Sequence, residues 1–203
     1  GSKIYGPKGV GVLYKKRGVK LNPLIYGGNQ EHGLRAGTEN LPAIAGLAKA
    51  VSLIDPPSPP TSPRLRRSKK ASDGRSKKES NRVSELRDYF FEHVHKAIPD
   101  LKINGAMGSI RLPNNINISI PDLDSENILL ELDKYGIYAS AGSACTAHSV
   151  EPSHVLKAIG LEKKYLKGAL RFSLGRQTTK KDIDYVLEVL PRIVKDLKKR
   201  YLK

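Results

Sequence analysis

The 203-residue sequence predicts an α/β protein whose second half is a compact layer of antiparallel or mixed strands packed with helices. Three observations lead to this fold class. After residue 82, segments with helical spacing of apolar residues alternate with short strand-like segments. Isoleucines at positions 116, 118 and 120 predict a half-buried strand. Apolar residues at helical spacing predict a last helix from Lys180 to about Tyr201, capped by Thr179.

The first 54 residues combine one expected strand, one long loop and one expected helix. Residues 10–14 are apolar and β-branched, which predicts a buried strand. Residues 23–38 are too rich in glycine for a helix and too irregular for a strand. Such a loop can bring backbone N–H groups to an anion, although a plain surface loop is the more common case. Thr38 or Asn40 can cap the following helix, expected over residues 43–54, with Pro42 in its first turn.

Residues 55–82 differ in kind from the rest of the chain. Prolines at 56, 57, 59, 60 and 63 are followed by a Ser/Lys/Arg-rich run with nine basic residues between Arg64 and Arg82. Burial of so few apolar side chains cannot offset the conformational entropy that the segment would lose on folding. We therefore expect a disordered linker or insertion. The run contributes much of the formal charge of +16 and predicts weak, nonspecific polyanion binding. No aromatic residue interrupts it, so it lacks the stacking surface of a single-strand binder.

The remaining elements follow in order from their apolar patterns and their capping residues. Asp124 is expected to cap a helix, and Gly160 to end another. We expect helices over residues 83–97, 125–134 and 152–160, and strands over 101–103, 115–120, 137–139 and 169–174.

The single cysteine, Cys145, lies in a run of small residues from Ala141 to His148. It could be a buried apolar filler or a reactive thiol in a mobile loop, and this window alone favours neither. One cysteine argues against a disulfide framework and favours a reducing compartment, for which we predict the cytoplasm. No apolar run is long enough to span a bilayer. The start, Gly1-Ser2, has no Met and no apolar signal core, which indicates a cloning remnant or the cut edge of a longer protein.

Four segments in this order and spacing resemble the pyridoxal-phosphate-dependent cysteine desulfurases, a class-V aminotransferase-like group of fold type I. They are Lys3–Gly9, Gly28–Thr38, Gly142–His154 and Arg171–Thr179. The resemblance covers nearly all of the chain except about residues 55–82, and only the C-terminal half of the family's usual length. It implies that residues 1–54 end the large cofactor-binding domain. Residues 55–82 would then be a linker or insertion, and 83–203 the small C-terminal domain with the catalytic cysteine loop.

The resemblance also assigns roles to individual residues. Lys3 matches the catalytic lysine that bonds to the pyridoxal phosphate, and Thr38 matches a residue that reaches the cofactor phosphate of the partner subunit. Arg171 matches the arginine that binds the substrate carboxylate through its planar fork of donors. Cys145 matches the nucleophile that takes the sulfur of L-cysteine as a persulfide and leaves L-alanine. We expect His148 and His154 to be structural.

The match has departures and a large gap. Ser2 stands where the family usually has histidine, and His32 stands where arginine is common. The family's N-terminal half, with most of the cofactor ligands, has no counterpart here, so we expect little or no activity from this chain alone. The implied partners are L-cysteine, a second subunit, an iron–sulfur scaffold or other sulfur acceptor, and a separate N-terminal half. The alternative is a desulfurase-like binding module for a scaffold protein or nucleic acid.

Overall fold

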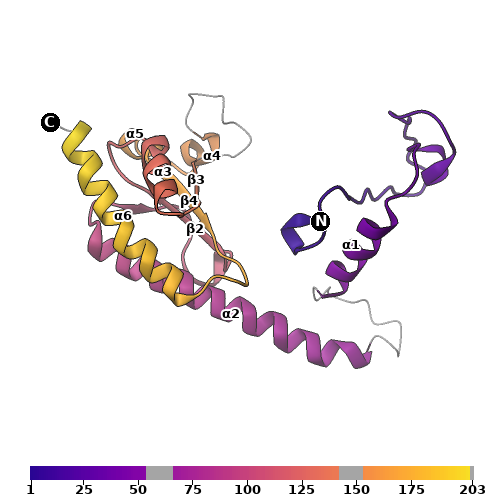
Figure 1. Cartoon of the computed structure of the whole chain (residues 1–203), viewed down its shortest axis with the longest axis horizontal. Helices are drawn as coiled ribbons and strands as arrows, with labels where there is room; N and C mark the ends of the chain where they lie inside the picture. The colour runs from indigo at the N-terminus through magenta and orange to yellow at the C-terminus, as the bar shows by residue number, and fades with distance from the viewer. Residues whose placement is uncertain (54–65, 142–152, 202–203) are drawn as a thin grey trace. The chain divides into compact units, whose positions relative to one another are not determined.

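The computed structural model describes residues 1–53, 66–141 and 153–201, with only the backbone described for 66–76. The chain divides into two compact units, Gly1–Ser76 and Lys77–Lys203 (Figure 1). The three-part domain division expected from the sequence stays a prediction.

The first unit contains two short 3-10 helices, η1 (Ser2–Ile4) and η2 (Gln30–Gly33), and the helix α1 (Leu41–Leu53). Of the two predicted caps, Asn40 is confirmed, because its side-chain oxygen accepts a hydrogen bond from the backbone N–H of Ala43 at 3.2 Å. The helix begins two residues before the expected residue 43. The N-terminal turn packs closely on α1: a Cβ at Gly46 would meet the ring of Pro7. Glycine at this position therefore lets the two segments approach each other.

The predicted strand over residues 10–14 is wrong, because this segment has no regular secondary structure. Its apolar side chains are exposed, with 83% of Val12 and 86% of Tyr14 accessible to solvent. A strand requires a second strand as hydrogen-bonded neighbour, and no described strand pairs with this segment, although the Val10 carbonyl accepts from the N-terminal amine of Gly1 at 3.3 Å.

The long helix α2 (Arg66–Ala97) differs from the expected irregular segment. Residues 66–82 are helical, so the absence of regular structure predicted for 55–82 does not hold there; residues 55–65 lie outside the described residues. Lys, Arg, Glu and Ala favour helices, and the segment continues directly into the amphipathic stretch from Val83. Arg82 also ties α2 to the loop before the last helix: it pairs with Glu79 and donates to the backbone carbonyls of Gly175, Arg176 and Thr178.

The second unit is built on an antiparallel sheet of four strands, in the order β1-β2-β4-β3. The strands are β1 (Lys102–Ile103), β2 (Asn115–Ser119), β3 (Ser140–Ala141) and β4 (Ala169–Ser173). β3 begins after the predicted residues 137–139, because the chain still turns at Gly136, whose φ is 68°. Next to the central pair of strands, the Ile120 N–H donates to the Gly168 carbonyl. No side chain fits at Gly168, because a Cβ there would overlap the carbonyl oxygen of Ile120.

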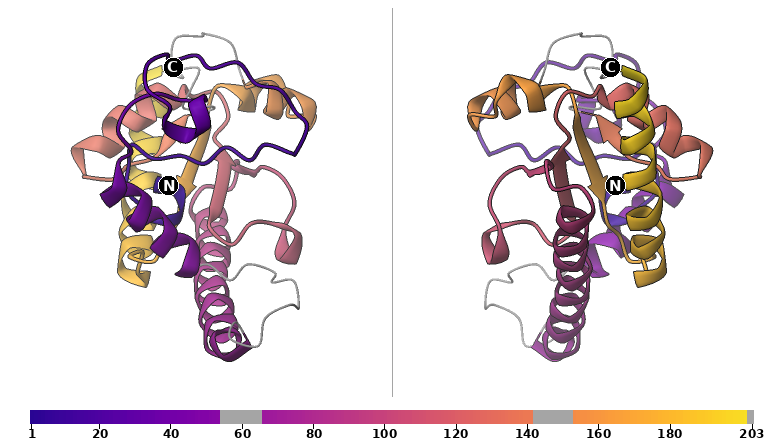
Figure 2. Two further views of the ribbon diagram at one scale, coloured as in Figure 1. Left: turned by 90° about the vertical axis from the view of Figure 1, so that its right-hand side faces the viewer. Right: turned by 90° about the vertical axis from the view of Figure 1, so that its left-hand side faces the viewer.

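Helices α2, α3 (Ser125–Lys134) and α6 (Lys180–Tyr201) pack with the sheet around one apolar core. Ile116, Ile118, Leu170 and Phe172 supply the sheet side of this core. α2 and α6 run side by side in both views of Figure 2, and the Tyr89 hydroxyl on α2 donates to Asp184 on α6 at 2.9 Å. Two short helices, α4 (His154–Ala158) and α5 (Lys163–Leu166), pack with Ala169 in a second apolar cluster.

The two faces of the sheet differ in chemistry. Side chains alternate between the faces along a strand, so the apolar residues of β2 and β4 lie against the core while Asn117 and Arg171 lie on the opposite face. This polar face is where a functional site can form in the second unit. No helix in the described ranges is both long enough and apolar enough to cross a membrane.

Candidate functional site

Arg171 occupies the middle of β4, with strands on both sides. It lies directly opposite Asn117 of β2 and Ser140 of β3. It is half-buried, whereas its neighbours Leu170 and Phe172 are buried in the core. Its guanidinium makes no hydrogen bond or ion pair with any described residue. A half-buried guanidinium with no internal partner is suited to binding an anionic ligand.

A buried asparagine connects the polar face to the β1–β2 connection. Asn104 is 4% exposed, and its side-chain amide nitrogen donates to Asn117 Oδ1 at 2.7 Å and to Ser119 Oγ at 2.8 Å. The sequence prediction did not single out these residues. The available signal was the alternation Asn-Ile-Asn-Ile-Ser from Asn115, which places three polar side chains on one face of β2.

Two buried arginines, Arg87 and Arg111, fix the connection that carries Asn104. Arg111 donates to the backbone carbonyls of Asn104, Ala106 and Asn115. Its guanidinium also lies 5.0 Å from the ring centre of Phe91. Burial, and next the nearby Arg87 charge, lower the pKa of Arg111 below its usual value. Asn104 is thus held from both its backbone and its side chain.

Lys3 lies in the short helix η1, where its side chain is exposed. The turn is closed by hydrogen bonds from the N–H groups of Ile4 and Gly6 to the carbonyl of Gly1, at 3.1 and 3.0 Å. It ends at Tyr5, whose φ of 61° is unusual for a residue with a side chain. The lysine is therefore presented on a defined turn that packs on α1.

Thr38 follows the glycine-rich loop and is also exposed. Gly37 N–H donates to the Gln30 side chain at 3.2 Å, and Arg35 donates to the Ala36 carbonyl at 3.1 Å. Among the described residues no interaction joins Lys3 to Thr38. Arg171 belongs to the second unit.

The predicted nucleophile Cys145 and the nearby His148 lie outside the described residues. His154 is the first residue of α4 and is exposed. The structure therefore brings Arg171 together with Asn117 and Ser140, but it does not describe the cysteine loop.

Pyridoxal phosphate fits this set of residues only in part. Lys3 offers an amine and Thr38 a hydroxyl, and both side chains are exposed. The pyridine nitrogen of the cofactor is usually held by an acid, yet no Asp or Glu is buried in the part of the chain that the structure describes. The described residues do not form a complete site for this cofactor.

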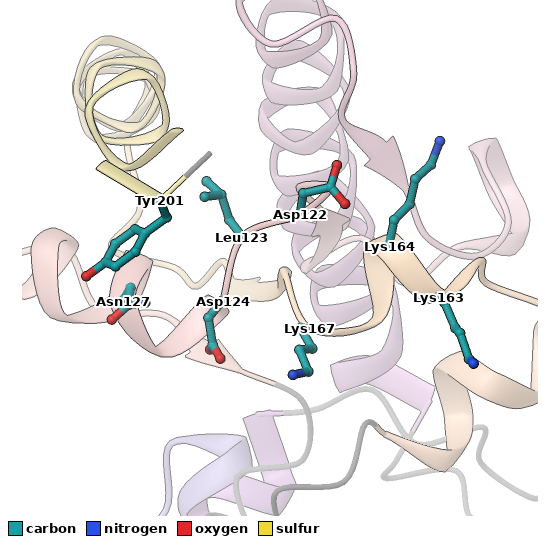
Figure 3. A pocket seen from close by; sticks show the side chains of 8 residues that line it. All are labelled: Asp122, Leu123, Asp124, Asn127, Lys163, Lys164, Lys167 and Tyr201. Carbon is teal, nitrogen blue, oxygen red and sulfur yellow. The ribbon is translucent and has the colours of Figure 1, made fainter. Parts of the chain in front are cut away.

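An open pocket of about 330 Å³ lies elsewhere in the second unit, between the start of α3 and α5 (Figure 3). Asp122, Asp124, Lys163, Lys164 and Lys167 line it. Their charged groups point in different directions and do not converge on one point (Figure 3). Of the predicted site residues that the structure describes, Lys3, Thr38 and Arg171, none lines this pocket. Across residues 1–53, 66–141 and 153–201, no cluster of His, Cys, Asp and Glu is suited to a metal ion.

Known proteins resemble the chain over most of its length. The family model described as aminotransferase class-V matches residues 1–57 and 70–186. A cysteine desulfurase IscS of Dictyoglomus turgidum is 46% identical over 200 residues, covering 97% of this chain and 45% of the relative. A cysteine desulfurase of a Nostoc species is 48% identical over 198 residues, covering 98% of this chain and 45% of the relative.

Solved structures agree with these relatives. A NifS-like protein superposes with a TM-score of 0.72 at 30% identity, covering 96% of this chain and 45% of that protein. A NifS-like protein from Rickettsia africae gives a TM-score of 0.63 at 28% identity, covering 87% of this chain and 41% of that protein. The chain spans about half the length of the curated relatives it matches.

Proposed function

Because the chain belongs to the class-V aminotransferase family, whose members use pyridoxal phosphate, we propose that it is the C-terminal portion of a cysteine desulfurase. Its curated relatives carry that name at 46% and 48% identity. The structural observation that carries the proposal is Arg171, a half-buried arginine on the polar face of the sheet that has no hydrogen-bond or ion-pair partner among the residues the structure describes. L-cysteine has the carboxylate that such an arginine binds.

The proposed reaction moves one sulfur atom from L-cysteine to the thiol of Cys145. The C–S bond of the substrate breaks, a proton takes the place of sulfur on that carbon, and an S–S bond forms on Cys145. L-cysteine and a thiol thus become L-alanine and a persulfide, with no external oxidant or reductant. Arg171 orients the substrate through its carboxylate, and Cys145 carries the sulfur to an acceptor.

The remaining predicted site residues belong to the same proposal. Lys3 would hold pyridoxal phosphate through its amine, and Thr38 would hold the phosphate of the cofactor bound to a second subunit. The incomplete fit of the cofactor implies that further chain supplies the rest of its site. We propose a homodimer, an iron–sulfur scaffold or other sulfur-acceptor protein as partner, and action in the cytoplasm.

The basic stretch from Arg64 to Arg82 supports a second candidate function, a binding module for a scaffold protein or nucleic acid. Replacing Cys145 separates the two functions. A desulfurase loses persulfide formation in Cys145→Ser, whereas a binding module keeps its affinity for its partner.

The test joins the chain to the N-terminal half of the Dictyoglomus turgidum relative and measures alanine formed from L-cysteine with pyridoxal phosphate. With a dithiol reductant present to release the outer sulfur of the Cys145 persulfide as sulfide and restore the thiol, we expect steady alanine formation by the joined protein and little or none by the 203-residue chain. Cys145→Ser should reduce alanine formation to background, while Thr146→Ser in the same loop serves as the matched control. Alanine formation at an unchanged rate in Cys145→Ser would reject the proposed role of the thiol.

A further inference from the structure

We propose that Asn117 is a second donor to the carboxylate that Arg171 binds, so that the two residues form one carboxylate site on the polar face of the sheet. The identity of the carboxylate, that of the substrate amino acid, rests on the function proposed above. The site itself rests on the geometry of β2, β4 and the residue Asn104.

The register of the sheet places the two side chains next to each other. Asn117 and Arg171 are direct cross-strand partners in an antiparallel pair. Such partners share one face, with their Cβ atoms about 5 Å apart. Both residues are half-buried, and the flanking residues Ile116, Ile118, Leu170 and Phe172 are buried on the other face.

Asn104 determines which end of the Asn117 amide faces Arg171. The Asn104 amide nitrogen donates to Asn117 Oδ1 at 2.7 Å, and the Asn104 backbone N–H donates to the Asn117 carbonyl at 2.9 Å. Asn104 directly follows β1, which flanks β2 on the side away from β4. The Asn117 oxygen therefore lies on the β1 side, and its two N–H donors lie on the β4 side, toward Arg171.

The buried environment supports this orientation of the two amides. Asn104 Oδ1 is the buried side-chain atom without a partner among the described residues. Turning the Asn104 amide over would put its nitrogen, with two donors, in that unpaired position. Leaving two donors unsatisfied costs more than leaving one acceptor unsatisfied, so the orientation with Asn117 nitrogen toward β4 is favoured.

In this orientation two donor groups are neighbours on one face of the sheet, and neither has an acceptor among the described residues. The Asn117 amide nitrogen and the Arg171 guanidinium cannot bond to one another, because neither offers a lone pair. Asn117 carries no negative charge that would neutralise the arginine. A planar carboxylate has two oxygens and satisfies both groups, one oxygen accepting from the guanidinium and the other from the amide. Asn117 therefore adds specificity for a carboxylate beyond what a lone arginine gives.

The test measures carboxylate binding to the 203-residue chain by NMR, without cofactor and without the cysteine chemistry. L-alanine is titrated against the chain while the side-chain N–H signals of Asn117 and Arg171 are followed. L-alaninamide, which keeps the ammonium group but lacks the carboxylate, is the matched ligand control. We expect saturable shifts of both signals with L-alanine at millimolar concentration and none with L-alaninamide.

Two variants address the role of Asn117. Asn117→Asp replaces the donor by a carboxylate that pairs with Arg171, and we expect it to weaken L-alanine binding at least about tenfold. Asn117→Leu removes the donor without adding charge, and we expect at least about fivefold weaker binding. Asn115→Asp places the same charge two residues along β2, opposite Ser173, where Arg111 already donates to the side chain at 3.3 Å and neutralises the added charge. We expect it to change affinity less than about twofold. Unchanged core NMR signals establish that each variant folds.

The proposal is overturned if L-alaninamide shifts the two signals as strongly as L-alanine, or if no saturable shift occurs with either ligand. It is equally overturned if Asn117→Asp and Asn117→Leu both bind L-alanine within about twofold of the original chain. Failure of the desulfurase function is distinguishable. In that case L-alanine still binds at Asn117 and Arg171, while the joined protein forms no alanine from L-cysteine.

Discussion

At the scale of single residues, Arg87 and Arg111 fix the position of the Asn104 side-chain amide. Arg87 is 2% exposed and donates to the carbonyls of Arg111 and Leu112 at 3.2 and 3.0 Å. Arg111 in turn binds the backbone on both sides of the β1–β2 connection. Asn104 begins that connection and holds Asn117 beside Arg171. The proposed carboxylate site on the sheet therefore depends on two buried arginines that hold the β1–β2 connection.

Replacing Arg87 by methionine should lower the free energy of unfolding by about 2–4 kcal/mol, because it leaves buried carbonyl groups without donors. Urea unfolding followed by circular dichroism measures this change. Arg192→Met is the matched control, since Arg192 pairs with Glu188 on the exposed surface of α6 and should leave the midpoint nearly unchanged. Equal midpoints for the two variants would show that Arg87 has no structural role.

The start of α6 shows how a short sequence signal defines an element. The Thr179 backbone N–H donates to the Asp182 carboxylate at 2.8 Å, and the Asp182 backbone N–H donates to the Thr179 hydroxyl oxygen at 3.4 Å, as in a capping box. The Thr179 hydroxyl also donates to the same carboxylate at 2.8 Å. The two hydrogen bonds to this carboxylate, that from the backbone N–H first, hold the pKa of Asp182 below its usual value. A carboxyl group whose pKa is lower in the folded than in the unfolded state stabilises the folded state at pH values above its ordinary pKa. This stabilisation is lost as the pH falls through the lowered pKa of the folded state.

Asp182→Asn should therefore reduce stability at neutral pH, because asparagine keeps an acceptor but not the charge. The difference in stability between Asp182→Asn and the original chain should be largest above about pH 4 and should shrink as the pH falls below that value. Thermal unfolding midpoints across this range measure it. Asp196→Asn on the same helix is the control, and a gap for Asp182→Asn that stays constant down to acidic pH would contradict the expected linkage.

The elements of the second unit could be predicted because their patterns are local. Asp124 caps α3 as expected, accepting from the Glu126 N–H at 2.9 Å, and Ile116 and Ile118 are buried as their alternation indicated. The segment around Val12 could not be predicted, since a strand forms only with a partner strand. Residues 66–82 were assigned as irregular from their charge, whereas helix propensity and the Arg82 contacts favour a continued helix.

The residues of the candidate site likewise differ in whether a local sequence pattern indicates them. Arg171 could be singled out as a candidate from its motif, and its position on β4 between two strands is compatible with the proposed binding role, which stays a prediction. Asn117 could not be identified, because its partner Asn104 becomes adjacent only through the pairing of β1 with β2. The role of Cys145 stays a prediction, since this residue lies outside the described ranges.

The two units of the whole molecule differ in how much apolar surface they bury. The second unit has one continuous core that joins α2, α3, α6 and the sheet. In the first unit, small residues such as Ala43 and Ala50 are buried with Leu47, while Leu13, Tyr14 and Leu24 are exposed. Large apolar side chains that stay exposed are candidates for contact with another protein surface, as expected if the first unit is part of a larger domain.

Hydrogen exchange of the 203-residue chain should reflect this difference. Backbone amides of β2 and β4 should exchange only by global unfolding, whereas those of α1 should exchange at least about 100-fold faster, since a helix of that length is marginal by itself. In the protein joined to the relative's N-terminal half, the α1 amides should become protected. Equal protection of α1 and β4 in the isolated chain would contradict the division into a stable and a dependent unit.

The central claim, that this chain carries the sulfur-accepting thiol of a cysteine desulfurase, is tested most directly by the mass of the peptide that contains Cys145. The joined protein is incubated with L-cysteine and pyridoxal phosphate, quenched with a thiol-trapping alkylator and digested. We predict that the Cys145 peptide gains the mass of one sulfur atom in step with the alanine released. Alanine release with no added sulfur on the Cys145 peptide, in a protein whose sulfur acceptor has been left out, would contradict the claim.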